Sequence, residues 1–204
     1  MVNIVGKVFE NLAIGFVAVI LVVYPREYFK AYIITRFGDD TPKKLGRLSL
    51  NPLVHLDPIG TIAFIMFNFG WSRPVPVIPM RLKNPRKALL IISVFGPILG
   101  AITFIVYGII AKRVENYYLF STFYRAAKWS LTYALLSLFP IPPLDGSRIL
   151  GVILPEKYID WYIKYEVYGV LFLLGLLLLW VLPLIMSPFI NVIESLTNFI
   201  IYGG

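Results

Sequence analysis

The sequence predicts an all-α polytopic membrane protein that forms a single transmembrane domain over residues 1–204. Of these residues, 58% are hydrophobic and only 15% are charged, and the mean hydropathy is +0.78. Soluble domains contain about 45–50% apolar and about 25% charged residues. Uncharged runs also occupy residues 88–111, 129–144 and 167–193. The first and last of these runs reach the ~20 residues that a helix needs to cross a bilayer core.

The first span is expected at about residues 8–36, because residues 12–24 are uncharged and apolar. No small-residue cleavage site follows, so we expect a retained helix and not a removed signal peptide. The next stretch, residues 38–58, is rich in glycine, proline and aspartate and is predicted to be a loop. Within it, the alternation at residues 47–50 predicts a small β excursion at about residues 45–56.

The middle of the chain holds one short apolar segment and two predicted spans. Residues 59–71 are expected to form either a thin span or a re-entrant element packed against protein. Residues 88–111 are predicted to cross the membrane. A further span at about residues 129–144 ends in a proline-rich break directly before Asp145. Asp145 is therefore expected at a broken helix end.

The last span is predicted at about residues 165–188, and residues 189–204 are expected to form an interfacial amphipathic tail. The net charge is +8, and the positive residues cluster between the apolar runs. Such clusters in membrane proteins set the topology and contact lipid headgroups. Membrane lipids are therefore expected partners, whereas nucleic acid is not.

The counts of cysteine and histidine restrict the chemistry that this chain can perform. It contains no cysteine and one histidine. These counts exclude disulfides, thiolate zinc sites and a cysteine nucleophile. They also exclude any metal site within the chain that needs two imidazoles.

Charged residues inside the first predicted span are the first functional candidates. Arg26 and Lys30 are four residues apart and share one helix face, with Glu27 beside them. Ionisable residues at membrane depth usually face a bundle interior, where they pair or mark function. Alternatively, the two cations snorkel to the interface from the end of a long helix. The spacing alone leaves both interpretations open.

Three long motifs follow one another along the chain, at residues 46–61 (GRLSLNPLVHLDPIGT), 69–77 (FGWSRPVPV) and 140–148 (PIPPLDGSR). Together they resemble the site-2 protease family of intramembrane zinc metalloproteases, in its compact prokaryotic form without a PDZ domain. The resemblance covers about residues 20–170. It implies a site-2 protease-like transmembrane core and a multi-pass protein integral to a prokaryotic cytoplasmic membrane.

The catalytic motif of that family, HExxH, supplies two histidine ligands for zinc and a glutamate general base. The resemblance places Arg26 and Lys30 at the two histidine positions and Glu27 at the general-base position. Asp145, in the family's late PxPxLDG motif, takes the position of the third zinc ligand. Because both histidines are replaced, the peptidase motif is degenerate. We therefore expect Glu27 to be idle and the chain to bind no zinc or other cofactor, with zinc confined to active relatives.

Other positions of the implied cleft also depart from the family. Ser137 stands where the family carries the asparagine of NxxPxPxLDG, and Gly100 stands where its GPxxN motif carries asparagine. Pro140, Pro142 and Gly146 keep the family pattern and are expected to line the cleft.

The resemblance therefore predicts a catalytically inactive homologue, a pseudoprotease, that binds or regulates a transmembrane protein partner. One alternative is an active intramembrane metalloprotease in which Glu27, Asp145 and His55 serve as unorthodox ligands. Another is a small transporter or channel with a polar pathway through Arg26, Lys30 and Asp145.

The loop motif offers a simpler role for His55. It lies in the same segment as Asn51 and Asp57, and we expect it to fix the loop through hydrogen bonds. If no metal ion is present, Glu27 and Asp145 would be buried anions at considerable energetic cost. We therefore predict that Arg26, Lys30 or both point inward and pair with these carboxylates.

Overall fold

The computed structural model describes residues 4–154 and 159–203 of the chain. Three helices in this part are long and apolar enough to cross a membrane: α1 (Ile4–Arg36), α4 (Pro85–Arg113) and α8 (Val181–Tyr202). The remaining helices are α2 (Thr41–Lys44), η1 (Pro52–His55), α3 (Pro58–Phe67), η2 (Pro79–Arg81), α5 (Tyr117–Ser137), α6 (Asp145–Ile153) and α7 (Ile159–Leu178). The predicted all-α fold class is confirmed.

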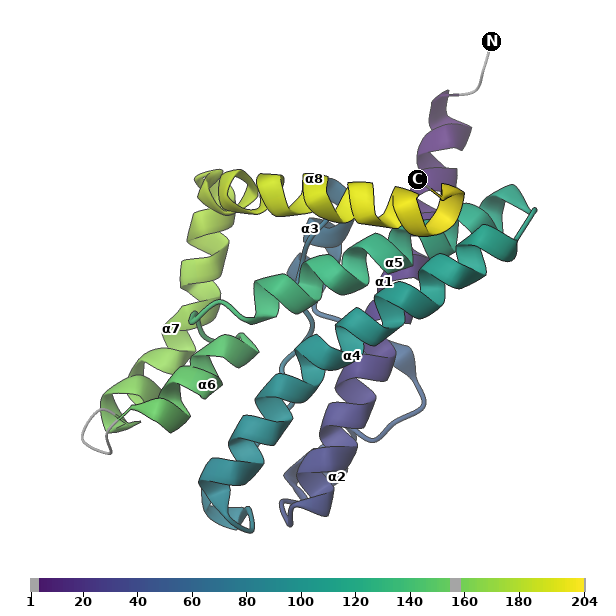
Figure 1. The fold of residues 1–204 in the computed structure, drawn as a ribbon. Helices are drawn as coiled ribbons and strands as arrows, with labels where there is room; N and C mark the ends of the chain where they lie inside the picture. The colour runs from purple at the N-terminus through teal and green to yellow at the C-terminus, as the bar shows by residue number, and fades with distance from the viewer. Residues whose placement is uncertain (1–3, 155–158, 204) are drawn as a thin grey trace.

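The helices form a bundle in which α1 and α4 lie next to each other and α5 packs against both (Figure 1). Helix α8 lies across one end of this bundle and contacts α4 and α5. Helix α7 runs along one side and leads from α6 towards α8. This arrangement brings the middle of α1 close to the start of α6, where the candidate site lies.

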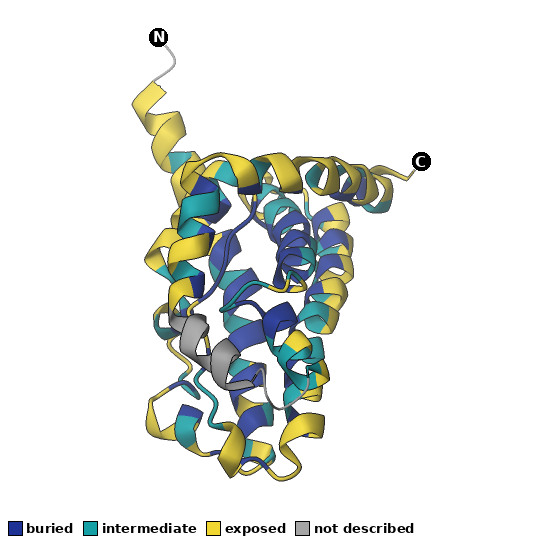
Figure 2. Ribbon diagram, turned by 90° about the vertical axis from the view of Figure 1, so that its left-hand side faces the viewer, coloured by how far each residue is buried: buried dark blue, intermediate teal, exposed yellow. Residues whose placement is uncertain are grey.

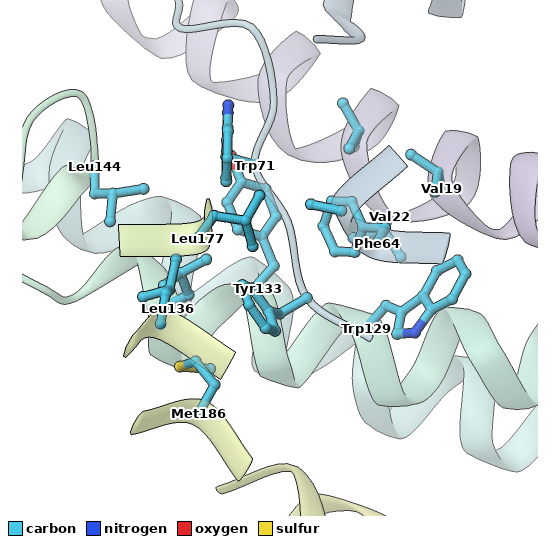
Figure 3. Close-up of a cluster of buried hydrophobic side chains, with 14 of the residues drawn as sticks. Val19, Val22, Phe64, Trp71, Trp129, Tyr133, Leu136, Leu144, Leu177 and Met186 are labelled. Atoms are coloured by element: carbon cyan, nitrogen blue, oxygen red, sulfur yellow. The ribbon is translucent and has the colours of Figure 1, made fainter. Parts of the chain in front are cut away.

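Buried apolar side chains from α1, α3, α5, α7 and α8 form the main core of the bundle (Figure 3). Phe64 of α3 packs between Trp129 and Tyr133 of α5, with ring centroids 5.7 and 5.6 Å apart. The outer faces of the long helices remain exposed, and α1 begins with exposed turns that stand clear of the bundle (Figure 2). On α4 the exposed side chains recur on one face, which is the pattern of a lipid-facing surface: Ile98, Ile102, Ile105 and Ile109.

Side chains in the loop motif start the short helices. Asn51 Oδ1 accepts a hydrogen bond from Leu53 N (3.0 Å) at the start of η1. Asp57 Oδ1 accepts one from Gly60 N (2.8 Å) at the start of α3. In both cases proline is the first helical residue, where its missing N–H costs nothing. Asn51 and Asp57 are thus capping residues of the loop.

The expected β excursion is wrong for residues 45–56. In the described part of the chain the β pairing is a single antiparallel bridge between Leu56 and Ser72. The capped helical turn at 52–55 takes the place of a strand. Arg47 also donates hydrogen bonds to the carbonyl groups of Val54, Arg73 and Pro74. These backbone groups are therefore paired with a side chain and not with a neighbouring strand.

Two predicted spans have different bounds in the structure. The helix expected at 129–144 begins much earlier, at Tyr117, and ends at Ser137. The span expected at 165–188 is not one helix, because α7 ends at Leu178 and α8 begins at Val181. Between them Trp180 adopts a left-handed conformation with φ 63°. The tail predicted at 189–204 is therefore part of α8 as far as Tyr202.

The short apolar segment at 59–71 contains α3, which has 10 residues. At 1.5 Å per residue such a helix is about 15 Å long, roughly half of a hydrocarbon core. Gly60, Ala63 and Phe64 of this helix are buried against the bundle. Of the two predicted forms, the geometry favours the element packed against protein.

Candidate functional site

The four ionisable residues singled out by the sequence lie together in the interior of the bundle. Arg26, Glu27 and Lys30 come from the middle of α1, and Asp145 is the first residue of α6. Each of the four is at most 4% exposed. The cluster therefore consists of two cations and two carboxylates that are all removed from solvent.

Asp145 accepts hydrogen bonds from both cations. Arg26 Nη2 lies 2.6 Å from Asp145 Oδ2, and Lys30 Nζ lies 2.7 Å from Oδ1 and 2.9 Å from Oδ2. These short contacts are charge-assisted hydrogen bonds. The prediction that a cation points inward and pairs with a carboxylate is confirmed, and the snorkelling alternative is wrong for both residues.

Glu27 is held less tightly than Asp145. Its Oε1 lies 3.4 Å from Arg26 Nε and 4.0 Å from Lys30 Nζ. It also accepts a long hydrogen bond from the hydroxyl of Tyr133, at 3.5 Å. Its Oε2 is buried and has no hydrogen-bond partner among the described residues. Glu27 therefore contributes charge to the cluster but has hydrogen-bonding capacity to spare.

Tyr133 of α5 is a member of the site that sequence reasoning missed. Its ring lies under the guanidinium of Arg26, with 3.9 Å from Cζ to the ring centroid. Its hydroxyl group accepts a hydrogen bond from Ser72 N (3.0 Å) and lies 2.6 Å from Ser72 Oγ. Tyr133 thus joins α1, α5 and the extended segment 69–78. Its place within an apolar run gave no signal of this role.

Glycine residues allow the helices to approach the cluster closely. A Cβ atom on Gly96 of α4 would lie 2.6 Å from Arg26 Nη2 and 2.8 Å from Asp145 Oδ2. One on Gly100 would lie 2.8 Å from the Cβ of Ala134, so Gly100 packs α4 against α5. One on Gly146 would lie 2.1 Å from the carbonyl oxygen of Leu138. Gly100 and Gly146 therefore position the helices around the cluster.

The turn between α5 and α6 brings Asp145 to the cluster. Ser137, at the end of α5, donates a hydrogen bond to Ala134 O (2.8 Å), one turn back in its own helix. Pro140 and Pro142 lie in the turn, which cannot continue α5 as a helix. A Cβ on Gly169 of α7 would lie 2.1 Å from Pro142 O, so α7 packs closely on this turn.

The cavity beside the cluster is small. Its volume is about 20 Å³, enough for about one water molecule. Its lining includes Glu27, Lys30, Ser72, Ser137, Asp145 and Arg148. Arg148 also reaches Val75 O, at 3.4 Å. In this conformation the cavity cannot hold a peptide backbone.

The donor set of the cluster does not fit a zinc ion. Among the described residues there is no group of three or more histidine, cysteine, aspartate or glutamate side chains that could hold a metal. Both oxygens of Asp145 already accept hydrogen bonds from cations. A metal ion ~4 Å from such a cation would be repelled by about 4 kcal/mol per unit charge, even at an effective dielectric constant of about 20.

His55 does not join the cluster as an unorthodox ligand. Its Nε2 lies 3.3 Å from Ser49 O, and its ring packs edge-on against Tyr24, with centroids 5.6 Å apart. Burial lowers the pKa of His55, so the imidazole is held in its neutral form. The hydrogen bond within the loop agrees with the simpler of the two roles expected for this residue.

The chain is similar to a known bacterial protein. Over 178 residues the chain is 38% identical to "Putative zinc metalloprotease YwhC" of Bacillus subtilis (strain 168). The match covers 81% of this chain and 80% of the relative. No protein-family model and no solved structure matches the chain.

Proposed function

We propose that this chain, which belongs to the zinc metalloprotease family of its Bacillus subtilis relative, is a catalytically inactive member that binds or regulates a transmembrane partner. Within that family we assign it to the site-2 protease type, on the three sequence motifs at 46–61, 69–77 and 140–148. The degenerate HExxH motif is the basis for inactivity.

The observation that carries the proposal is the double pairing of Asp145 with Arg26 and Lys30. Asp145 stands at the third-ligand position and the two cations stand at the histidine positions of the family motif. Two fixed positive side-chain charges therefore occupy the place of a divalent ion. The cluster of two cations and two carboxylates is neutral, whereas a bound divalent ion would leave it with an uncompensated charge of two.

Loss of zinc removes two contributions to peptide hydrolysis. In an active enzyme the metal polarises the scissile carbonyl and lowers the pKa of the attacking water. The glutamate at the motif position of Glu27 would then take a proton from that water. Here the Glu27 carboxylate lies near two side-chain cations, at 3.4 Å from Arg26 Nε and 4.0 Å from Lys30 Nζ, and neither cation supplies a nucleophile.

Partner binding would use the extended segment 69–78, which runs past the cluster. Extended segments can bind an unwound helix by adding a strand. Several carbonyl groups of this segment already accept hydrogen bonds from side chains: Arg73 O and Pro74 O from Arg47, and Val75 O from Arg148. A partner strand would have to displace these arginines. Binding is therefore expected to require a movement of this segment.

Metal analysis of the purified protein tests the inactivity. We expect well below one zinc per chain after purification without chelator, and no shift in thermal stability on addition of EDTA. A stoichiometry near one zinc per chain, lost together with stability on chelation, would overturn the proposal. Expression in zinc-supplemented medium ensures that a low value reflects the site and not the supply.

Crosslinking in native membranes tests the partner-binding role. A photoreactive residue at Val77, in the extended segment, should form an adduct with a transmembrane protein. The same residue at Ile102, which is 50% exposed on the lipid-facing side of α4, serves as the matched control. Identical adducts from both positions would contradict specific binding at this segment.

A further inference from the structure

A second polar cavity lies away from the Asp145 cluster, between the end of α3 and the first half of α5. Its volume is about 340 Å³, within the range of about 300–1,000 Å³ typical of ligand sites. It is lined by Ile65, Asn68, Phe120, Ser121, Tyr124, Arg125, Lys128 and Trp129. None of these residues takes part in the charge cluster or in the proposed function.

Arg125 is held in a fixed orientation by neutral groups. Its Nη1 donates to Asn11 O (3.1 Å) and its Nη2 donates to Asn11 Oδ1 (2.7 Å), both on α1. Among the side chains that the structure describes, in residues 4–154 and 168–203, no carboxylate forms an ion pair with it. The guanidinium is thus oriented but not neutralised, and it retains further N–H donors.

The other polar groups of the cavity are mainly donors as well. Lys128 Nζ lies 3.1 Å from Glu194 Oε1 of α8, so one of the two cations is compensated. Asn68 Oδ1 accepts a hydrogen bond from Trp129 Nε1 (3.1 Å), which leaves the amide NH₂ of Asn68 as a donor. With Arg125 uncompensated, the cavity carries a net positive charge and a surplus of donors. Its chemistry matches an anion with several acceptor oxygens.

The surrounding residues place the cavity near a membrane surface. Exposed aromatic residues mark this end of the bundle: Tyr117 and Tyr118 at the start of α5, and Trp180 before α8. The basic residues Lys112 and Arg113 end α4, shortly before Tyr117 in the chain. Aromatic and basic residues of this kind concentrate at the level of lipid headgroups. Helix α8 lies across the same end of the molecule (Figure 1).

We infer that this cavity binds a phosphate group, supplied by the headgroup of an anionic phospholipid. The phosphate would accept hydrogen bonds from Arg125 and Asn68, and Ser121 would contact the polar part of the headgroup. Phe120 and Ile65 would contact the part of the acyl chains nearest to the headgroup. Basic pockets between helices are known to bind anionic headgroups in this manner.

Native mass spectrometry of the full chain in detergent tests the inference. The probes are phosphatidylglycerol, phosphatidylcholine and inorganic phosphate. We expect phosphatidylglycerol to bind at least about fivefold more tightly than phosphatidylcholine, which corresponds to about one unpaired cation at the membrane surface. Arg125→Gln should lose this preference. Arg113→Gln, which removes an exposed cation at the same end, should keep it within about twofold.

A second variant guards against misfolding of Arg125→Gln, because Arg125 also links α5 to α1. Ser121→Trp fills the cavity and leaves every charge in place, and it should weaken phosphatidylglycerol binding to the same extent. Equal losses in Arg125→Gln and Arg113→Gln, or no effect of Ser121→Trp, would overturn the site. Binding of inorganic phosphate without any preference for the lipid would overturn the headgroup assignment.

Discussion

Lys30 and Asp145 are 115 positions apart in the chain, and the ammonium group of Lys30 donates to both carboxylate oxygens of Asp145, at 2.7 and 2.9 Å. This contact fixes the middle of α1 to the first residue of α6. It also shows how a buried carboxylate can be balanced without a metal ion. The stability of the bundle should therefore depend on the charge cluster.

Removal of one partner from this cluster should destabilise the protein strongly. Lys30→Ala or Asp145→Ala leaves an uncompensated buried charge. Each variant should therefore lower the unfolding free energy by about 3–5 kcal/mol. The double variant Lys30→Ala/Asp145→Ala should cost less than the sum of the single variants, because it removes both charges. Thermal and denaturant unfolding in one detergent measures these values. Arg113→Ala, an exposed cation on α4, is the control and should change stability by less than about 1 kcal/mol.

The space around the cluster can be tested separately from its charges. Gly96→Ala places a methyl group 2.6 Å from Arg26 Nη2 and 2.8 Å from Asp145 Oδ2, so it must separate that pair or push α4 outward. Overpacking of this kind costs about 1–3 kcal/mol. Gly175→Ala on α7 is the matched control, because a Cβ there meets nothing within 4 Å. The control should be neutral or slightly stabilising, since alanine favours a helix over glycine by about 1 kcal/mol. Equal melting temperatures for both variants would contradict the close approach of α4.

The sequence was sufficient to predict the long apolar helices α1 and α4 and the pairing at Asp145. The pairing was predictable because a metal site without its histidines leaves carboxylates that need another source of positive charge. By contrast, the break between α7 and α8 was missed because residues 167–193 form one uncharged run. That break depends on packing, since the ring of Trp180 lies 5.2 Å from that of Phe67 on a distant segment.

The contact between Ser72 and Tyr133 was missed for a related reason. The two residues are 61 positions apart. Ser72 lies in the motif at 69–77, but nothing in that motif or around Tyr133 links the two residues. Only the packing of the extended segment on α5 brings their hydroxyl groups together. Hydrogen bonds between distant neutral side chains leave no recognisable signal in a sequence. Charges within an apolar run and capping residues before a helix can be recognised by residue type and position.

Acidification should destabilise the loop that carries the motif at 46–61. Burial lowers the pKa of His55 below its ordinary value of 6.5. The unfolded chain therefore binds a proton more readily than the folded one, so the contribution of His55 is complete above about pH 6.5 and is lost as the pH falls. The loss cannot exceed about 1.4 kcal/mol per pH unit. Unfolding measured between pH 8 and pH 5 should show this slope.

His55→Gln should flatten that pH dependence, because His55 is the single histidine of the chain. The side-chain amide of glutamine can still donate to Ser49 O, which is the polar contact of the imidazole. Stability at pH 8 should therefore change less than the slope. An unchanged slope in His55→Gln would mean that another group titrates in this range.

Restoring the two imidazoles should restore metal binding. Arg26→His/Lys30→His places histidines four residues apart on one face of α1 and removes both cations from Asp145. With Asp145 as the third ligand, the double variant should bind about one zinc per chain, and EDTA should then lower its melting temperature. Without added zinc it should be less stable than the original protein, because its carboxylates lose their partners.

The matched control is the single variant Lys30→His, which supplies one imidazole but keeps Arg26 on Asp145. It should bind little zinc, since the remaining guanidinium repels the ion and only one nitrogen ligand is present. Peptidase activity need not return in the double variant. Ser137 and Gly100 lack the amide side chains of the family motifs, and the cavity of about 20 Å³ does not hold a peptide backbone. Equal zinc content in the single and double variants would refute the charge-replacement argument, because zinc would then bind without removal of both cations.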